Sequence, residues 1–395
     1  MSDAIHIATN IPESYRLIVD AIRTHYRTND FIPLHAPSVG EAEKQKLNEC
    51  IDSTFVSTVG QFVTDFEQQF RQFVGSNHAL SVVNGTMGLF LALKTLGVEK
   101  NDLVLTQSLT FVATANAIKM AHAEPFFIDV DKETYSLSLD VLKQFLENQT
   151  TQQQGRCVHK QSGKTIAVCM PMHTLGFVGD IEQIVSLCHS HNIKVVEDAA
   201  ESLGSYIGRQ HSGTFADIGV FSFNGNKIMT TGGGGMLVTQ HQDYAHRARH
   251  LSTTAKKTHP WLFEHDEIGF NLRMPNINAA LGLAQLQKLP AFIEEKRALA
   301  QWYQTRFSDI DGINVVSPKQ SQTANQWLNG LVFESLEARD QFLAYSNQQQ
   351  VQTRPLWTPM HQLDIYQHCI RTQMDNTEWL AQRVVNIPSG VRHHG

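Results

Sequence analysis

Short apolar runs alternate with amphipathic stretches through the middle of the chain. The apolar runs cover residues 79–83, 103–105, 125–130, 166–170, 193–196, 218–222 and 234–238. Several stretches between them repeat apolar residues at intervals of three and four, at 85–96, 114–122, 139–146 and 181–191. The runs have the length of buried strands, and the repeats have the period of a helix face. Strands that alternate with helices predict βαβ units, and therefore a mostly parallel sheet covered by helices on both faces.

The pattern differs on either side of this region. Residues 1–30 are partly helical, and the glutamine-rich stretch at 149–161 is predicted to be a surface loop. After residue 260, helical spacing predicts helices at 278–289, 291–307 and 337–347, together with two short β runs. We therefore expect an N-terminal helical arm (1–40), a large α/β domain (41–260) and a smaller α+β domain (261–395).

Composition narrows the classes of function. The 395 residues carry a net charge of −6, with no cluster of basic residues of the kind that nucleic-acid-binding proteins carry. The N-terminal residues Met1–Ala4 lack the basic and apolar segments of a signal peptide, and no apolar run has the length of a membrane span. Five scattered cysteines favour reduced thiols in a cytosol; they are Cys50, Cys157, Cys169, Cys188 and Cys369. We expect a cytoplasmic protein that binds neither nucleic acid nor a membrane.

Residues that follow the predicted strands are the first candidates for chemistry, because ligands of such sheets bind at the carboxyl ends of the strands. One of them is the turn Asn84-Gly85-Thr86-Met87. A glycine here lets a ligand approach the backbone, and the amides at a helix N-terminus attract an anion such as a phosphate. Hydroxyls of Thr86 and Ser222 would add donors. The same four residues are also compatible with an ordinary strand-to-helix turn.

An acidic residue, Asp198, ends the apolar run that begins at Ile193. A buried carboxylate is costly unless it has a cationic or hydrogen-bonded partner. Asp198 taken alone is best interpreted as the N-cap of a following helix. The alternative is a carboxylate that keeps a pyridinium nitrogen protonated.

Lys227 follows the run at 218–222 and precedes four glycines at 232–235. A partly buried lysine at the end of a strand can act as an amine nucleophile, although most lysines are solvated. Phe111, after the second strand, either stacks on a flat ring or belongs to the core. Together, a phosphate turn, an aromatic ring, a carboxylate and a lysine are the groups that hold pyridoxal 5′-phosphate (PLP) as a Schiff base.

Four sequence motifs resemble those of the DegT/DnrJ/StrS family of sugar aminotransferases. They are Asn84-Gly85-Thr86, Glu197-Asp198-Ala199-Ala200, the Ser222–Lys227 motif with Thr230-Thr231-Gly232, and Gly269-Phe270-Asn271-Leu272-Arg273-Met274. The resemblance runs from about Ile32 to Tyr366. It implies the fold-type-I, aspartate aminotransferase-like architecture: a large α/β domain with a mixed, mostly parallel sheet, and a smaller α+β domain.

The resemblance also implies roles for individual residues. Lys227 would form the internal aldimine with PLP, and Asp198 would pair with the pyridine nitrogen. Phe111 would stack on the ring. The phosphate would be held at Gly85 by Thr86, the Met87 amide and Ser222. Asn271 would reach the cofactor of the neighbouring subunit, so that the active unit would be a homodimer with shared active sites.

Departures from the usual family motifs point to a subgroup. Position 201 is commonly Gln and is Glu201 here, which affects the contact to the 3′-oxygen of the cofactor, and position 224 is commonly His and is Asn224 here. The strings Ser222–Gly235 and Arg354–His361 are similar to the LegC-like subgroup. That subgroup aminates carbon 4 of a nucleotide-linked 4-keto-6-deoxy-N-acetylhexosamine on the way to legionaminic acid or bacillosamine-type sugars. L-Glutamate would be the donor, with pyridoxamine phosphate as the intermediate form of the cofactor.

Two alternatives to this function remain open. One is amination of a 3-keto nucleotide sugar. The other is a non-catalytic regulator that kept the fold, although such a protein would be expected to lose Lys227 or Asp198. His173, Arg273 and His361 are candidates for substrate contacts. Nineteen histidines raise the question of a metal, but the HxxxH pair His246 and His250 is flanked by arginines and has no evident third ligand, so no metal site is expected.

Overall fold

The computed structural model describes residues 11–392. The expectations for Met1–Ala4 lie outside the described residues, as does the C-terminal pair His393-His394. Within residues 11–392, no helix combines the length and the hydropathy that crossing a membrane requires.

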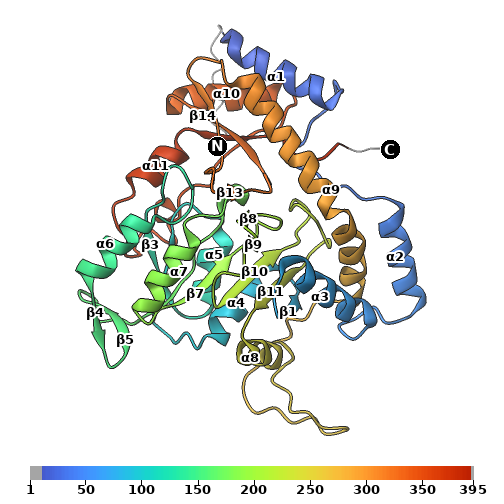
Figure 1. Cartoon of the computed structure of the whole chain (residues 1–395), viewed down its shortest axis with the longest axis vertical. Coiled ribbons are helices and arrows are strands. Elements are labelled where there is room, and N and C mark those ends of the chain that lie inside the picture. Colours follow the sequence, from blue (N-terminus) through green and yellow to red (C-terminus); the bar gives the residue numbers. More distant parts are fainter. Residues whose placement is uncertain (1–10, 393–395) are drawn as a thin grey trace.

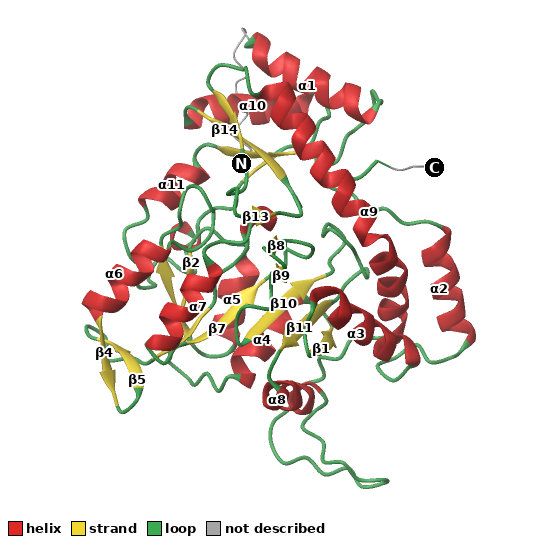
Figure 2. Ribbon diagram, viewed as in Figure 1, coloured by secondary structure: helices red, strands yellow, loops and turns green. Residues whose placement is uncertain are grey.

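A seven-stranded sheet forms the centre of the molecule (Figures 1 and 2). Its strands, in spatial order, are β1 (His78–Val82), β11 (Gly235–Thr239), β10 (Ile218–Ser222), β7 (Lys194–Asp198), β6 (Ile166–Cys169), β2 (Leu103–Gln107) and β3 (Glu124–Ile128). Neighbours from β10 to β3 are parallel, whereas β11 is antiparallel to both β1 and β10. The prediction of a mixed, mostly parallel sheet is confirmed, because short buried strands of this kind are recognisable from their apolar runs.

Helices cover both faces of this sheet. On one face, α4 (Gly85–Thr95), α5 (Val112–Met120) and α8 (Gln242–Ser252) pack against Val104, Val196 and Val220. On the other, α6 (Leu139–Gln149) and α7 (Ile181–Ser190) pack against Leu105 and Val195, and α3 (Gln61–Val74) packs against Phe221. Adjacent strand residues thus contribute to different clusters, as the alternation of side chains along a strand requires.

A second, antiparallel sheet lies beyond the first and has the order β12 (Ile313–Val315), β14 (Asn329–Phe333), β16 (Val384–Ile387) and β15 (Arg354–Pro355). Helices α1 (Glu13–Tyr26), α10 (Leu336–Gln348) and the end of α9 (Asn276–Phe307) pack on it (Figure 1). Other elements of residues 11–392 include α2 (Glu41–Asp52), α11 (Asp375–Ala381), the short 3₁₀ helices at Thr174–Gly176 and Met360–Gln362, and the strands β8 (Tyr206–Ile207), β9 (Gln210–His211) and β13 (Gln322–Thr323). The domain boundaries at residues 40 and 260 stay predictions.

Two helices predicted at 278–289 and 291–307 are one helix, α9 (Asn276–Phe307), of 32 residues. Pro290 lies inside it. A proline removes one backbone hydrogen bond and usually ends or kinks a helix, at a cost of about 3 kcal/mol. Here Leu289 and Phe292 are buried on both sides of the proline, and packing of this kind stabilises the helix through the interruption.

The glutamine-rich stretch predicted as a loop contains a β-hairpin instead, formed by β4 (Thr150–Gln153) and β5 (Arg156–His159). Its two-residue turn, Gln154-Gly155, has φ of 51° and 77°. Positive φ at both positions is the requirement of a type I′ turn, which matches the twist of the two strands. The prediction was wrong because apolar alternation is nearly absent from this stretch.

Candidate active site

A cavity of about 250 Å³ opens at the carboxyl ends of the central strands. Its wall includes the turn after β1, the end of β7, the end of β10 and the loop before β11. Predicted site residues in the lining are Gly85, Thr86, Phe111, Asp198, Glu201, Ser222, Asn224 and Lys227. The topology gathers them because parallel strands end at the same edge of the sheet, as expected from the sequence.

Lys227 lies in the turn region after β10, and its side chain is only 10% exposed. Its Nζ atom is 3.1 Å from Oε1 of Glu201 and 4.1 Å from the centre of the Trp327 ring. The Trp327 ring is fixed in turn, because its Nε1 donates a hydrogen bond of 2.8 Å to the Asn226 carbonyl. The amine is therefore held between a carboxylate and an aromatic face rather than solvated.

Asp198 is 3% exposed at the end of β7. The Thr114 hydroxyl donates to its Oδ2 at 2.7 Å, and the Ala200 amide donates to its Oδ1 at 3.2 Å. Burial raises the pKa of Asp198, while these two donors and the charge of Lys227 oppose that rise. The interpretation as a helix N-cap is wrong, because the residues after Asp198 form turns instead of an α-helix.

Glu201 is 2% exposed, and its second oxygen accepts a hydrogen bond of 3.0 Å from the Leu175 amide. Burial raises the pKa of Glu201 to about 7, against the opposing effect of Lys227. In the unfolded chain the reference pKa of this carboxyl is 4.5. The folded protein therefore prefers the neutral carboxyl, and that contribution to stability is lost as the pH rises through 7.

We expect Glu201→Gln to change how stability depends on pH. Glutamine mimics the neutral carboxyl, so the variant should lack the decline of the wild type between pH 4.5 and 8, a difference of about 3 kcal/mol. Urea unfolding of the cofactor-free proteins at pH 5 and pH 8 measures it, with the exposed Glu182→Gln as the control. The same change in the free energy of unfolding between pH 5 and pH 8 for wild type and Glu201→Gln would contradict the expectation.

The predicted phosphate site brings the start of α4 against the end of β10. A Cβ atom on Gly85 would lie 2.9 Å from Cβ of Ser222, so only glycine permits this approach. The hydroxyls of Thr86 and Ser222 both line the cavity, and neither has a hydrogen-bond partner among residues 11–392. The Met87 amide differs from the expectation, since it donates at 2.8 Å to the Asn84 side chain, which caps α4.

Aromatic side chains form the outer wall of the cavity. Phe111 is 48% exposed, and its ring lies 6.5 Å from that of Trp357 in an edge arrangement. Trp327 and Trp357 both come from the part of the chain after α9. Asn224 is exposed at the rim and donates to the side chain of Asn226 at 3.1 Å.

Five predicted site residues do not line this cavity: Met87, described above, and His173, Arg273, His361 and Asn271. His173 is buried against Glu197, 2.9 Å away, and Arg273 is buried in an ion pair with Glu67 at 2.8 Å. His361 contacts the Ser108 hydroxyl at 2.7 Å. Asn271 is exposed and pairs through its backbone with Thr253. Their substrate or cofactor roles stay predictions.

Three residues of the site escaped the sequence analysis: Thr114, Trp327 and Trp357. Thr114 carried a weak signal, since it lies three residues after Phe111, in the first turn of a helix that was predicted to begin two residues too late. Trp357 lies in the Arg354–His361 string that resembles the LegC-like subgroup, but nothing in that string placed its ring at the cavity. Trp327 carried no signal, because no local pattern tells which part of a second domain folds back over the sheet.

The cavity has the donor set that PLP requires. It contains a shielded amine, a buried carboxylate, two unpartnered hydroxyls beside a helix N-terminus, and an accessible aromatic ring. In this arrangement Lys227 would hold the cofactor covalently, Asp198 would face the ring nitrogen, and Thr86 and Ser222 would hold the phosphate.

Comparisons with known proteins agree with this chemistry. Residues 37–394 match the sequence profile of the DegT/DnrJ/EryC1/StrS aminotransferase family. GDP-perosamine synthase of Escherichia coli O157:H7 is 36% identical, over 91% of this chain and 93% of its own length. dTDP-4-dehydro-2,3,6-trideoxy-D-glucose 4-aminotransferase of Saccharopolyspora spinosa is 29% identical, over 90% and 91%.

A solved structure supports the same conclusion for the fold. The aminotransferase TlmJ of Streptoalloteichus hindustanus superposes with a TM-score of 0.83 at 28% identity, over 91% of this chain and 93% of its own. The expected fold-type-I architecture is confirmed.

Proposed function

The chain belongs to the DegT/DnrJ/EryC1/StrS aminotransferase family, and from that premise we propose that it aminates carbon 4 of a nucleotide-linked 4-keto-6-deoxy-N-acetylhexosamine. It is an enzyme, a PLP-dependent aminotransferase that acts on a nucleotide sugar. L-Glutamate is the proposed amino donor. The product would enter the synthesis of legionaminic acid or bacillosamine-type sugars of surface polysaccharides.

The observation that carries this proposal is the position of Lys227, 3.1 Å from Glu201 in a cavity that also holds Asp198. When bound, PLP supplies a conjugated ring that takes up the electrons of a broken Cα–H bond. Lys227 Nζ is placed to accept the α-proton of L-glutamate and, in the second half of the cycle, to return a proton to the sugar carbon. The buried carboxylate of Asp198 would keep the ring nitrogen protonated.

Support for a nucleotide sugar comes from the wall of the cavity and from the relatives. Trp327, Trp357 and Phe111 give a sugar ring apolar surfaces to pack against, next to the amine that does the chemistry. Carbon 4 is the proposed position because one relative is named as a 4-aminotransferase of a 4-dehydro sugar. The motifs at 222–235 and 354–361, which resemble the LegC-like subgroup, favour the N-acetylhexosamine.

Analysis of the product distinguishes amination at carbon 4 from amination at carbon 3. Purified enzyme, PLP and L-glutamate are incubated with nucleotide-linked 4-keto or 3-keto 6-deoxyhexosamines, and the amino sugars are identified by mass and NMR. We expect a k_cat/K_M at least about tenfold higher for the 4-keto N-acetylhexosamine, the discrimination that one well-placed contact supplies. A preference for the 3-keto sugar would support the alternative position, and no amination of either would favour the regulator.

We also propose a homodimer with shared active sites. Asn271 is exposed and does not line the cavity of its own chain, so a role at the cofactor requires a second subunit. The segment before it carries large apolar side chains with little cover: Trp261 is 75% exposed, Phe263 78% and Ile268 86%. Exposed apolar side chains gathered on one loop are typical of an interface.

A mixture of two inactive variants tests this sharing. In a hybrid of Lys227→Ala and Asn271→Ala subunits, one of the two sites combines an intact Lys227 with an intact Asn271 from the other chain. Random reassociation should therefore restore about a quarter of the wild-type rate, although each variant alone is strongly impaired. No recovery in a mixture that size-exclusion chromatography shows to be hybrid would mean that Asn271 serves its own subunit.

A cytoplasmic location is proposed as well. All five cysteines are free and buried. Free thiols are typical of a reducing compartment.

A further inference from the structure

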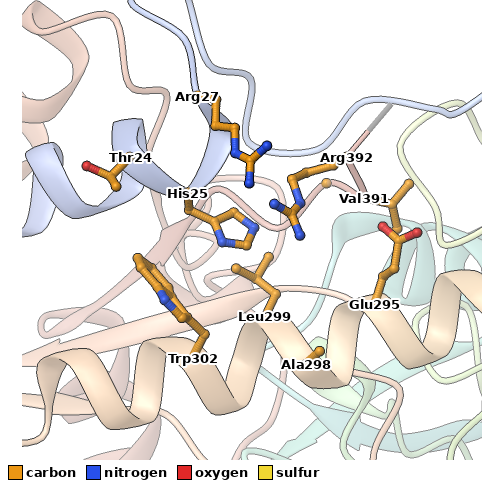
Figure 3. A pocket seen from close by; sticks show the side chains of 10 residues that line it. Thr24, His25, Arg27, Glu295, Ala298, Leu299, Trp302, Val391 and Arg392 are labelled. Atoms are coloured by element: carbon orange, nitrogen blue, oxygen red, sulfur yellow. The ribbon is translucent and has the colours of Figure 1, made fainter. Parts of the chain in front are cut away.

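A second cavity, of about 410 Å³, lies between the end of α1, the middle of α9 and residues 390–392 (Figure 3). It shares no lining residue with the cavity that contains Lys227. Its volume is in the range of small-molecule sites, about 300–1,000 Å³. Thr24, His25 and Arg27 form one wall, and these residues precede the region that matches the family.

Two arginines give this cavity its charge. The guanidinium groups of Arg27 and Arg392 point into the same space beside the His25 ring (Figure 3). Glu295 also lines the cavity and contributes a carboxylate to it (Figure 3). Two guanidinium groups on one space are suited to a phosphate, which they can bind with paired hydrogen bonds.

Flat and apolar side chains form the opposite wall. The rings of His25 and Trp302 lie 5.0 Å apart at 45°, and Leu299 and Ala298 complete the floor. Burial, together with Arg392 and Arg27, lowers the pKa of His25 to about 4. The imidazole is therefore neutral at pH 7 and offers a polar ring rather than a third charge. Nucleobases pack on such rings, and this packing tolerates any base because each has a π face.

We propose that this cavity is a regulatory site for a phosphorylated nucleotide, with the base against the His25–Trp302 wall and the phosphate on Arg27 and Arg392. An inorganic anion would use the arginines and leave the aromatic wall without a function. A purely apolar ligand would make no use of the two guanidinium groups. A nucleotide uses both walls, because its phosphate contacts the arginines while its base packs against the rings of His25 and Trp302.

A short series of contacts connects this site with the catalytic lysine. Residues 390–392 follow Ser389, whose carbonyl accepts a hydrogen bond of 2.6 Å from Nζ of Lys296. The same Nζ donates to the Trp327 carbonyl at 2.9 Å, and the Trp327 ring lies 4.1 Å from Nζ of Lys227. Lys296 is buried at 1% exposure and can hold both carbonyls only if they keep this separation. If a bound nucleotide displaces residues 390–392, the position of Trp327 should therefore change as well.

Calorimetric titration of the holoenzyme tests the binding. The probes are GDP and inorganic phosphate. The proteins are the wild type, the double variant Arg27→Gln/Arg392→Gln, and the control variant Arg16→Gln. Arg16 is an exposed arginine of the same helix, α1. Any GDP bound in the catalytic cavity is common to all three proteins. Wild type and Arg16→Gln should each bind one equivalent of GDP per chain in this cavity. The double variant should bind that equivalent at least tenfold more weakly. Phosphate alone should bind at least tenfold more weakly than GDP.

Identical GDP isotherms for the double variant and the wild type would overturn the site, and equal affinities for phosphate and GDP would overturn the role of the aromatic wall. Trp302→Leu provides a second variant that keeps both arginines. It should weaken GDP and leave phosphate unchanged, whereas unchanged binding of GDP would again overturn that role.

Initial rates test the regulation, and this part rests on the proposed function, whereas the calorimetric part does not. At saturating keto sugar, GDP should change k_cat at least twofold in wild type and Arg16→Gln but not in the double variant. The same response to GDP in all three proteins would overturn the regulatory role. A protein that binds GDP through Arg27 and Arg392 but aminates no sugar would fail only the proposed function.

Discussion

Lys227→Ala should lose turnover by at least about 10⁴-fold, the upper range for a positioned acid–base group. The variant lacks the only amine in the described lining of the cavity, and thus both the covalent attachment of the cofactor and the group that moves the α-proton. Absorbance spectra of the purified protein, before and after addition of PLP, and assays with L-glutamate measure the two losses. The exposed Lys143→Ala is the matched control and should behave as wild type.

Small primary amines refine this test. They can enter the space left by the lysine side chain and accept the α-proton, so they should restore part of the rate of Lys227→Ala. A variant that retains full activity without added amine would contradict the assignment of Lys227.

Asp198→Asn should lower k_cat by at least about 10²-fold, the size found for one preorganised electrostatic group. Asparagine keeps the shape, but it has one acceptor oxygen where Thr114 and Ala200 use two, and it carries no charge to keep a proton on the ring nitrogen. The cofactor should also dissociate more readily, which equilibrium dialysis measures. Asp364→Asn, an exposed substitution, is the control.

The variant Thr114→Val tests whether the charge of Asp198 or its hydrogen bond to Thr114 matters more. It removes one hydrogen bond to the carboxylate and keeps the charge, so its effect on k_cat should be clearly smaller than that of Asp198→Asn. Equal losses in the two variants would mean that the hydrogen bond, rather than the charge, is what the chemistry needs.

The sequence predicted the central sheet well because its strands are buried on both faces. Such strands are continuous apolar runs, and the turns after them are where parallel topology concentrates polar residues. Gly85, Phe111, Asp198 and Lys227 follow from this rule alone, and the structure brings all four into one cavity.

Predictions failed where distant packing decides the local structure. Pro290 indicates a helix end, yet contacts on both sides of it maintain α9. Asp198 resembles an N-cap, and only its hydrogen bonds to Thr114 and Ala200 show the partners that satisfy it. The Trp327 ring contacts Lys227 Nζ although the two residues are far apart in the sequence, and no local spacing of residues predicts this contact.

The central claim is that this chain passes an amino group to a nucleotide-linked keto sugar, and one half-reaction tests it directly. The enzyme is converted to the pyridoxamine phosphate form with L-glutamate, freed of 2-oxoglutarate, and mixed with a panel of 4-keto and 3-keto nucleotide sugars while the absorbance of the aldehyde form is followed. We predict that this absorbance returns in one turnover with the 4-keto-6-deoxy-N-acetylhexosamine. An enzyme that accepts the amino group from glutamate but never regains the aldehyde-form spectrum with any keto sugar would contradict the claim.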